Sequence, residues 1–155
     1  MNRFVWDTSA LVNIKEPNAD GYSPGHSLFK DLSQGIIPGP YQNIFPAISA
    51  FEIDASVSRK HREGKPILRD FYIVDDNSLI YPIDAGLIRR SAELVTKTGF
   101  SELRGADLIF GCIAFLENAY LVTMDNHFRR ITDDVKVIDL NLSRSYPEYR
   151  QLFGI

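Results

Sequence analysis

The sequence predicts a single three-layer α/β/α domain with a central, mostly parallel sheet covered by helices on both faces. Three observations favour this fold class. The chain has 155 residues, a length that suits one compact domain. Short strand-like runs alternate with helix-like segments, and those runs are almost continuously apolar, as in parallel sheets. Because no repeat, low-complexity tract or linker divides the chain, we treat residues 1–155 as one domain.

The first strand-to-helix unit lies at the N-terminus. Residues 3–6 (RFVW) form a short apolar run rich in strand formers, and residues 8–14 (TSALVNI) begin with hydroxyl side chains suited to the start of a helix. Proline, glycine, asparagine and aspartate mark a loop over residues 16–25. The spacing of leucine and phenylalanine then predicts a short helix over residues 26–35.

The strand-to-helix unit repeats in the middle of the chain. Residues 43–49 (NIFPAIS) have the apolar, β-branched character of a buried strand, and a helix is predicted over residues 50–64, where a glycine ends it. A further helix is predicted over residues 68–74, and a third strand over residues 78–84 (SLIYPID).

The last third of the chain continues the alternation. Residues 85–99 have an amphipathic helical pattern that ends at a glycine, and residues 105–119 predict an almost wholly apolar helix. A fourth strand is predicted over residues 120–125, a turn of helix over residues 126–131, and a fifth strand over residues 135–140. Four of the five strands are thus followed by helical segments, which favours a parallel sheet.

Composition narrows the class of protein. Hydrophobic residues at 45% and charged residues at 24% argue against disorder. The single cysteine, Cys112, cannot form an intrachain disulfide, and no basic-then-apolar leader precedes the first strand, so we expect a cytoplasmic protein. The longest apolar stretches, such as residues 108–116, are far shorter than the roughly 20 residues that span a bilayer. With a net charge of −3, any contact with nucleic acid must be local.

Four acids fall where strands end or helices begin: Asp7, Glu52, Asp107 and Asp125. In an open parallel sheet these positions lie near one edge, outside the carboxyl ends of the strands. Each acid alone also has an ordinary explanation, since Asp107 suits the first turn of a helix and Asp125 suits a helix cap. Carboxylates brought together repel one another unless a cation holds them. Acids without histidine or cysteine suit Mg²⁺ or Mn²⁺, which points toward phosphodiester chemistry.

The sequence resembles the PIN-domain ribonucleases, in particular the VapC toxins of bacterial and archaeal toxin–antitoxin pairs. The resemblance spans nearly the whole chain, in the stretches VWDTSALVN, PAISAFEIDASVSRK and RGADLIFGCIAFLENAYLVTMDNHFRRI. The family has a strand ending in Asp-Thr-Ser, a glutamate in the second unit, an Ala-Asp helix start, and a Thr-x-Asp-x-x-Phe ending. The matching residues here are Asp7-Thr8-Ser9, Glu52, Ala106-Asp107, and Thr123-Met124-Asp125 with Phe128.

The resemblance implies a metal-dependent endoribonuclease in which Mg²⁺ or Mn²⁺ lies at the scissile phosphate of RNA, leaving 5′-phosphate and 3′-hydroxyl ends. It assigns Asp7, Asp107 and Asp125 to direct coordination, and Glu52 to coordination or to orienting the attacking water. Some relatives have a further acid where Asn126 follows Asp125, so the number of metal ions stays open. The family also implies a cognate antitoxin and a homodimer. The aromatic tail, residues 146–155, suits either a neighbouring subunit or the protein's own core.

Several neighbours of the acids are candidates for supporting roles. Thr8 and Ser9 can contact substrate or cap the first helix, and Thr123 can donate a hydrogen bond to the Asp125 carboxylate or have no role. Arg59 and Arg104 are candidates for contact with RNA phosphate, although an ion pair with a glutamate on the same helix also explains Arg59.

Other functions compete with this hypothesis. A catalytically silent PIN-like module that binds RNA or protein is the main alternative, and the intact acids count against it. A phosphoacceptor signalling domain is disfavoured because Asp7 stands alone after the first strand. Dinucleotide binding lacks its Gly-x-Gly-x-x-Gly sequence. The three histidines, His26, His61 and His127, occupy polar or loop-like settings and are assigned no chemistry.

Overall fold

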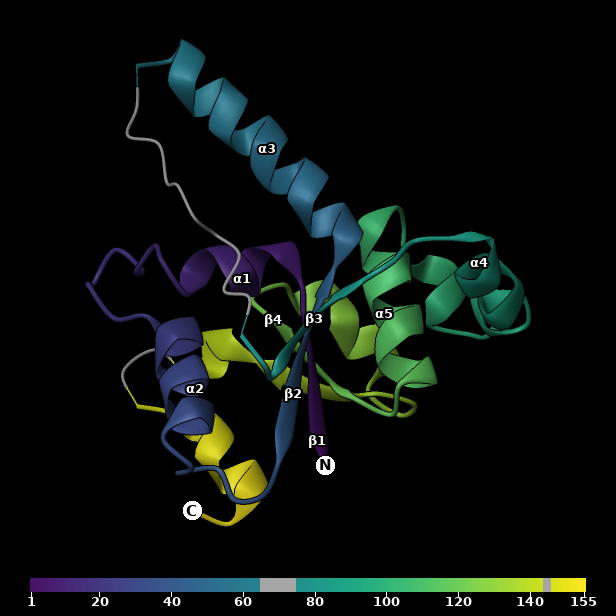
Figure 1. The fold of residues 1–155 in the computed structure, drawn as a ribbon. Coiled ribbons are helices and arrows are strands. Elements are labelled where there is room, and N and C mark those ends of the chain that lie inside the picture. Colours follow the sequence, from purple (N-terminus) through teal and green to yellow (C-terminus); the bar gives the residue numbers. More distant parts are fainter. Residues whose placement is uncertain (65–74, 144–145) are drawn as a thin grey trace.

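The computed structural model describes residues 1–64, 75–143 and 146–155 of the chain. Its centre is a sheet with the strand order β3-β2-β1-β4-β5, in which every neighbouring pair runs parallel (Figure 1). The strands are β1 (Asn2–Trp6), β2 (Tyr41–Pro46), β3 (Ser78–Tyr81), β4 (Tyr120–Thr123) and β5 (Lys136–Asp139). The predicted fold class is confirmed.

Helices cover both faces of this sheet. The α-helices in the described ranges are α1 (Thr8–Asn13), α2 (Pro24–Ser33), α3 (Ala47–Arg62), α4 (Ala85–Ser91) and α5 (Ala106–Leu116). The short 3₁₀ helices are η1 (Leu94–Thr96), η2 (Phe100–Glu102), η3 (Asn126–Ile131), η4 (Leu140–Leu142) and η5 (Glu148–Phe153). Alternate side chains of β1 enter two cores: Phe4 and Trp6 pack with α1 and α2, and Val5 packs with α4 and α5.

The strand order reverses beside β1. The chain moves outward from β1 through β2 to β3, then returns to place β4 on the other side of β1, with β5 beyond it. In open α/β sheets, ligands bind outside the carboxyl ends of the strands at such a switch in strand order. Asp7 directly follows β1 and Asp125 lies two residues after β4, so both acids stand at this switch point.

Some element boundaries differ from the predictions. The strand predicted over residues 43–49 is shorter at its end, because β2 stops at Pro46 and α3 begins at Ala47. A proline cannot donate to a strand ladder, but it is well tolerated at the start of a helix. The helix predicted over residues 68–74 lies outside the described residues.

The single helix predicted over residues 85–99 is wrong in its second half. The helix α4 ends at Ser91, and the chain continues as the short 3₁₀ helix η1. The β-branched Val95 and Thr96 have low helix propensity, and the Thr96 hydroxyl donates a hydrogen bond of 2.7 Å to the Glu93 carbonyl. Local side-chain bonding of this kind competes with a regular helix.

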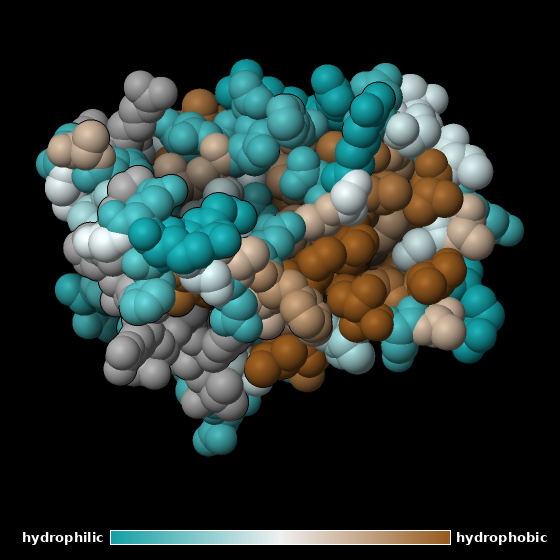
Figure 2. Space-filling model, turned by 90° about the horizontal axis from the view of Figure 1, so that it is seen from above, coloured by the Kyte–Doolittle hydropathy of each residue, from teal (hydrophilic) through white to brown (hydrophobic). Residues whose placement is uncertain are grey.

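Several large apolar side chains remain exposed on the surface. Phe51 on α3 is 76% exposed, and Ile80 of β3 and Ile88 of α4 are also exposed. Figure 2 shows apolar side chains gathered on the face seen from above, beside a polar region. Within the described ranges, no helix has the length and apolar character needed to cross a membrane.

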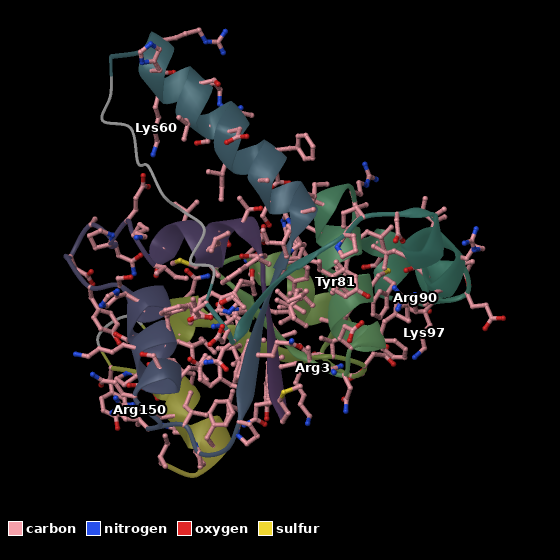
Figure 3. All side chains as sticks on the ribbon, viewed as in Figure 1. Arg3, Lys60, Tyr81, Arg90, Lys97 and Arg150 are labelled. Carbon is pink, nitrogen blue, oxygen red and sulfur yellow. The ribbon has the colours of Figure 1, made fainter. Side chains whose placement is uncertain are left out.

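The C-terminal helix η5 folds back onto α2 and completes one core. Tyr149 is buried, and its hydroxyl donates a hydrogen bond of 2.8 Å to the Asp31 carboxylate. Arg150 donates two hydrogen bonds, of 2.7 and 2.8 Å, to the two oxygens of the same carboxylate. Arg150 lies beside α2 in Figure 3. The aromatic tail therefore covers the protein's own core.

Candidate metal centre

One pocket at the carboxyl edge of the sheet brings the four predicted acids together. It has a volume of about 460 Å³, and its lining residues come from the ends of β1 and β4 and from α1, α3 and α5. These residues are Asp7, Thr8, Ser9, Val12, Glu52, Asp107, Phe110 and Asp125. Four acids that are far apart in the sequence thus share one cavity at the switch point between β1 and β4.

Asp7 is held by hydrogen bonds on both carboxylate oxygens. Its side chain caps α1, because Oδ1 accepts a bond of 2.7 Å from the Ala10 backbone N–H. The same oxygen accepts a bond of 2.7 Å from the Ser9 hydroxyl, and Oδ2 accepts one from the Thr123 hydroxyl. The orientation of this carboxylate is therefore fixed from α1 and from β4.

The Asp7 carboxylate is buried, and this burial changes its pKa. Burial is the largest cause that raises its pKa from 3.8 to about 6. Hydrogen bonds from Thr123, Ala10 and Ser9 lower the pKa, and the nearby charge of Asp107 raises it further. No lysine, arginine or histidine of the described residues forms an ion pair with Asp7. The site is therefore short of positive charge.

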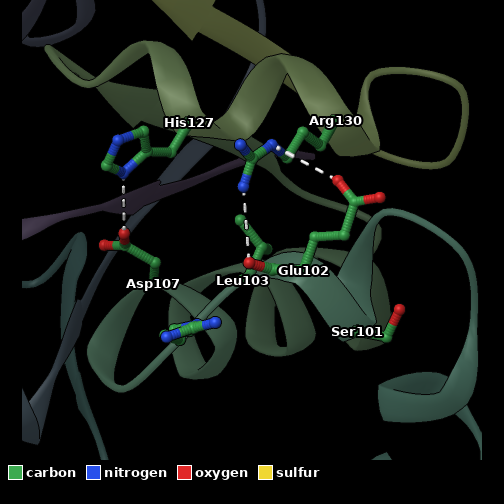
Figure 4. Close-up of a pocket in the computed structure, with 7 residues that line it drawn as sticks. Ser101, Glu102, Leu103, Asp107, His127 and Arg130 are labelled. Carbon is green, nitrogen blue, oxygen red and sulfur yellow. Dashed lines mark hydrogen bonds and ion pairs between the residues drawn. The ribbon is translucent and has the colours of Figure 1, made fainter.

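Asp107 and Asp125 form a closer group with a histidine. Asp107 lies in the first turn of α5, and Asp125 caps η3 by accepting a bond of 2.8 Å from the His127 backbone N–H. The His127 Nδ1 atom lies 3.4 Å from Asp107 Oδ2 and 3.3 Å from Asp125 Oδ1. Each of the three residues has one possible metal-ligand atom, a carboxylate oxygen or a ring nitrogen, and these three atoms lie within 4.8 Å of one another. Figure 4 shows the pair Asp107 and His127. Asp7 and Glu52 line the same pocket outside this close group.

Thr123 connects two of the acids, although not as the sequence suggested. Its hydroxyl donates to the Asp7 carboxylate and accepts a bond of 2.8 Å from the Asp125 backbone N–H. The predicted bond to the Asp125 carboxylate is replaced by these two, because the Asp125 side chain turns toward η3. Thr123 is fully buried, so its hydroxyl links the ends of β1 and β4 away from solvent.

The two hydroxyl residues after Asp7 have different surroundings. The Ser9 hydroxyl donates to Asp7 and accepts a bond of 3.1 Å from the Met124 backbone N–H, so it joins α1 to the segment after β4. The Thr8 hydroxyl oxygen is buried and has no hydrogen-bond partner among the described residues, although Thr8 lines the acidic pocket. An unpaired buried hydroxyl costs free energy. Together with the carboxylates, it fits a pocket that binds a divalent cation and its water shell.

The predicted RNA-contact residues occupy different positions. Arg104 lines a neighbouring cavity of about 540 Å³ that shares Asp107 with the acidic pocket and also contains His127 and Arg130. Figure 4 shows Arg130 paired with Glu102, at an Nε to Oε2 distance of 3.4 Å. Arg59 is exposed on α3, about 10 Å further along the helix than Glu52, and is not among the residues that line the acidic pocket.

Two residues near the acids have no role assigned from the sequence. His127 faces Asp107 and Asp125, and Arg130 lines the cavity beside them. A signal for His127 is its position two residues after Asp125, where a short turn can bring its side chain back toward the acid. Its approach to Asp107 has no counterpart in local sequence, because 20 residues separate the two.

Known proteins share this fold. The sequence model of a family described as PIN domain matches residues 4–134. A solved structure, VapBC2 from Rickettsia felis bound to a DNA fragment from their promoter, contains a chain that superposes with a TM-score of 0.60. The two sequences are 19% identical, and the match covers 88% of this chain and 97% of that one. At this identity the likeness is one of fold. No curated protein matches the sequence.

Proposed function

This chain belongs to the PIN-domain family, and on that premise we propose that it is an endoribonuclease that hydrolyses RNA phosphodiester bonds with Mg²⁺ or Mn²⁺. The observation that carries the proposal is the single pocket lined by Asp7, Glu52, Asp107 and Asp125. No lysine or arginine in the described ranges lines this pocket, and four carboxylates in one pocket suit a divalent ion far better than they suit an RNA phosphate alone.

Each acid has a role in this proposal. Asp7, Asp107 and Asp125 hold the ion, and Glu52 either joins them or orients the attacking water. A divalent ion supplies two things in such a site: it lowers the pKa of a water molecule, and it offsets the charge that develops on the leaving oxygen. The products then carry 5′-phosphate and 3′-hydroxyl ends.

Hydroxyl groups support the acids. Ser9 and Thr123 donate to Asp7 and so keep its two oxygens in a fixed orientation. Thr123 also binds the Asp125 backbone, which fixes the position of the second acid relative to the first. The unpaired Thr8 hydroxyl is available to donate to a water molecule or to a phosphate oxygen in the pocket.

In this proposal a few arginines near the acids contact the phosphates of RNA. Arg104 and Arg130 line the cavity that adjoins Asp107, and Arg59 lies on the exposed side of α3. Arginine binds phosphate oxygens through a planar fork of N–H donors. A protein with a net charge of −3 can therefore bind RNA at this edge while the rest of its surface stays acidic.

The proposed physiological role is that of a cytoplasmic toxin held by a cognate antitoxin, in a type II toxin–antitoxin pair, with the toxin itself a homodimer. Its support is the family, the resemblance to VapC toxins, and the exposed apolar side chains Phe51, Ile80 and Ile88, which an interface would bury. Light scattering coupled to gel filtration measures the mass of the purified protein. We expect twice 17.6 kDa, and a mass of 17.6 kDa would contradict the homodimer.

A cleavage assay tests the nuclease proposal directly. Purified protein is incubated with single-stranded and structured RNA in Mg²⁺, in Mn²⁺ and in a chelator, and the product ends are identified. A variant of an exposed acid, Asp133→Asn, serves as the matched control for Asp7→Asn. We expect cleavage only with a divalent ion, lost in Asp7→Asn and kept in the control. RNA that is bound but never cleaved would favour the silent binding module instead.

A further inference from the structure

We propose that His127 supplies a nitrogen ligand to the divalent ion of this site and thereby makes the site prefer Mn²⁺ over Mg²⁺. The inference rests on the proposed function, because it concerns the same ion. It adds a ligand of a different chemical type to a set that is otherwise built from carboxylates.

The position of the imidazole supports this role. Nδ1 is almost equally far from two carboxylate oxygens, 3.4 Å from Asp107 Oδ2 and 3.3 Å from Asp125 Oδ1. A single N–H points at one acceptor, and a good N–H···O bond is about 2.7–3.2 Å long. Adjacent ligands of an octahedral ion with bonds of 2.0–2.1 Å lie about 3 Å apart. The distances from Nδ1 to the two oxygens are therefore closer to those between neighbouring ligands of one ion than to that of a donor with one acceptor.

The backbone around His127 holds it in place beside the acids. Its own N–H donates to Asp125 Oδ1, which fixes the start of η3 against that carboxylate. The His127 side chain is 58% exposed, and the only side chains with which it is paired in the described ranges are Asp107 and Asp125. Among the residues that the structure describes, no other hydrogen bond or ion pair of the ring competes with these two acids.

Ligand chemistry then determines which ion is preferred. Mg²⁺ takes oxygen ligands and keeps several waters, whereas imidazole nitrogen is a ligand for first-row transition ions. The carboxylates of Asp7, Glu52, Asp107 and Asp125 serve either ion. Replacing one water ligand by the His127 nitrogen therefore favours Mn²⁺ over Mg²⁺. Mn²⁺ is the first-row transition ion that carboxylate and water ligands also suit.

Calorimetric titration without RNA tests the preference. The affinities for Mn²⁺ and Mg²⁺ are measured for the natural protein and for His127→Gln, with His26→Gln and His61→Gln as matched controls on exposed helical positions. We expect the ratio of Mn²⁺ to Mg²⁺ affinity to fall by at least about 10-fold in His127→Gln, because changes in residues that only support a metal ligand already lower metal affinity 10–100-fold. The controls should keep the natural ratio. An unchanged ratio in His127→Gln would overturn the inference.

Spin-echo spectroscopy of bound Mn²⁺ tests the ligand itself: the natural protein shows whether a histidine nitrogen binds the ion, and the variants show which histidine it is. Protein labelled with ¹⁵N-histidine should show coupling between Mn²⁺ and a histidine nitrogen, and His127→Gln should lose it while His26→Gln and His61→Gln keep it. Mn²⁺ bound without nitrogen coupling would overturn the inference and leave the nuclease proposal standing. Nitrogen coupling in a protein that cleaves no RNA would support the inference and contradict the nuclease.

Discussion

Asp7 and Asp31 are both 3% exposed, yet the pKa values of their carboxyl groups are shifted in opposite directions. For Asp31, burial alone would raise the pKa, but hydrogen bonds from Arg150 and Tyr149 and the charge of Arg150 outweigh it, and the pKa is lowered. For Asp7, burial prevails over three hydrogen bonds from uncharged donors, and the pKa is raised to about 6. Asp31 thus has a guanidinium as its hydrogen-bond partner, whereas Asp7 has only uncharged donors and lies near the charge of Asp107.

The comparison separates a structural acid from a candidate functional one. The Asp31 carboxylate receives its cation from the chain itself, through the fork of Arg150. The Asp7 carboxylate stands in a pocket with three other acids, where a cation from solution would balance the charge. Burial of an acid is therefore less informative than the charge of its partners.

The largest expected effect is on cleavage by Asp7→Asn. The amide keeps the size of the side chain but removes the charge that would hold the ion. Changes in residues that only support a metal ligand cost 10–100-fold, so loss of the ligand charge should lower the rate of RNA cleavage by at least about 100-fold. Asp31→Asn should cleave at the natural rate at a temperature where it is folded. An equal loss of cleavage rate in Asp7→Asn and Asp31→Asn would contradict the distinction between a functional and a structural acid.

The pH dependence of stability should have opposite signs at the two acids. The raised pKa of Asp7 means that the folded state binds its proton more tightly, so the Asp7 contribution to stability falls as pH rises from about 4 to about 6. Relative to the natural protein in chelator, Asp7→Asn should gain about 3 kcal/mol of stability between pH 3 and pH 7, a range that includes both pKa values, since each pKa unit corresponds to 1.36 kcal/mol.

For Asp31 the sign reverses. Its lowered pKa contributes stability that is present above the unfolded value of 3.8 and is lost as the pH falls below it. The destabilisation caused by Asp31→Asn should therefore shrink in acid. Urea unfolding of both variants at pH 3, 4, 5, 6 and 7 measures the two slopes. Slopes of the same sign would show that the two carboxylates do not differ as described.

The third effect is on the fold at neutral pH. Asp31→Asn removes the charged acceptor of Arg150 and Tyr149, whose bonds hold η5 against α2. We expect the free energy of unfolding to fall by about 1–3 kcal/mol, the range for a disrupted buried hydrogen-bond network. Tyr149→Phe removes one bond of this network and should cost less. Thermal unfolding of each variant, with Asp133→Asn as the control, measures the loss.

The smallest expected effect is that of Thr123→Val, which sharpens the account of Asp7. Valine matches the shape of threonine but cannot donate to the Asp7 carboxylate or accept from the Asp125 backbone. We expect RNA cleavage to fall about 10-fold, the lower end for a residue that supports metal ligands. Cleavage and Mn²⁺ affinity should fall together, since Thr123 acts through the acids. A loss of cleavage at unchanged affinity would assign Thr123 a separate role.

Local patterns account for what the sequence could predict. Strand-to-helix alternation predicts a parallel sheet, and the acids that follow β1 and β4 must then meet at its carboxyl edge, as Asp7 and Asp125 do. The boundaries were less accurate where residue preference and pattern disagree, as at Val95 and Thr96, where an amphipathic pattern does not produce a continuous helix.

Long-range contacts could not be predicted in this way. Arg150 binds Asp31 across 119 residues, and the Thr123 hydroxyl binds Asp7 across 116. A pattern of period two or 3.6 carries no information about such pairs. The approach of His127 to Asp107 could not be predicted for a related reason, since it depends on how η3 and α5 pack around the edge of the sheet.

The hydrogen bond between Thr123 and Asp7 can form only late in the synthesis of the chain. A ribosome makes β1, β2 and β3 first, and β4, which inserts on the other side of β1, leaves the ribosome only after residues 1–119. Until then the Asp7 carboxylate lacks the Thr123 hydroxyl, and the pocket lacks Asp125. A partly synthesised chain therefore has an unfinished acidic site, and any activity of that site begins only when the growing protein has joined the two sides of its sheet.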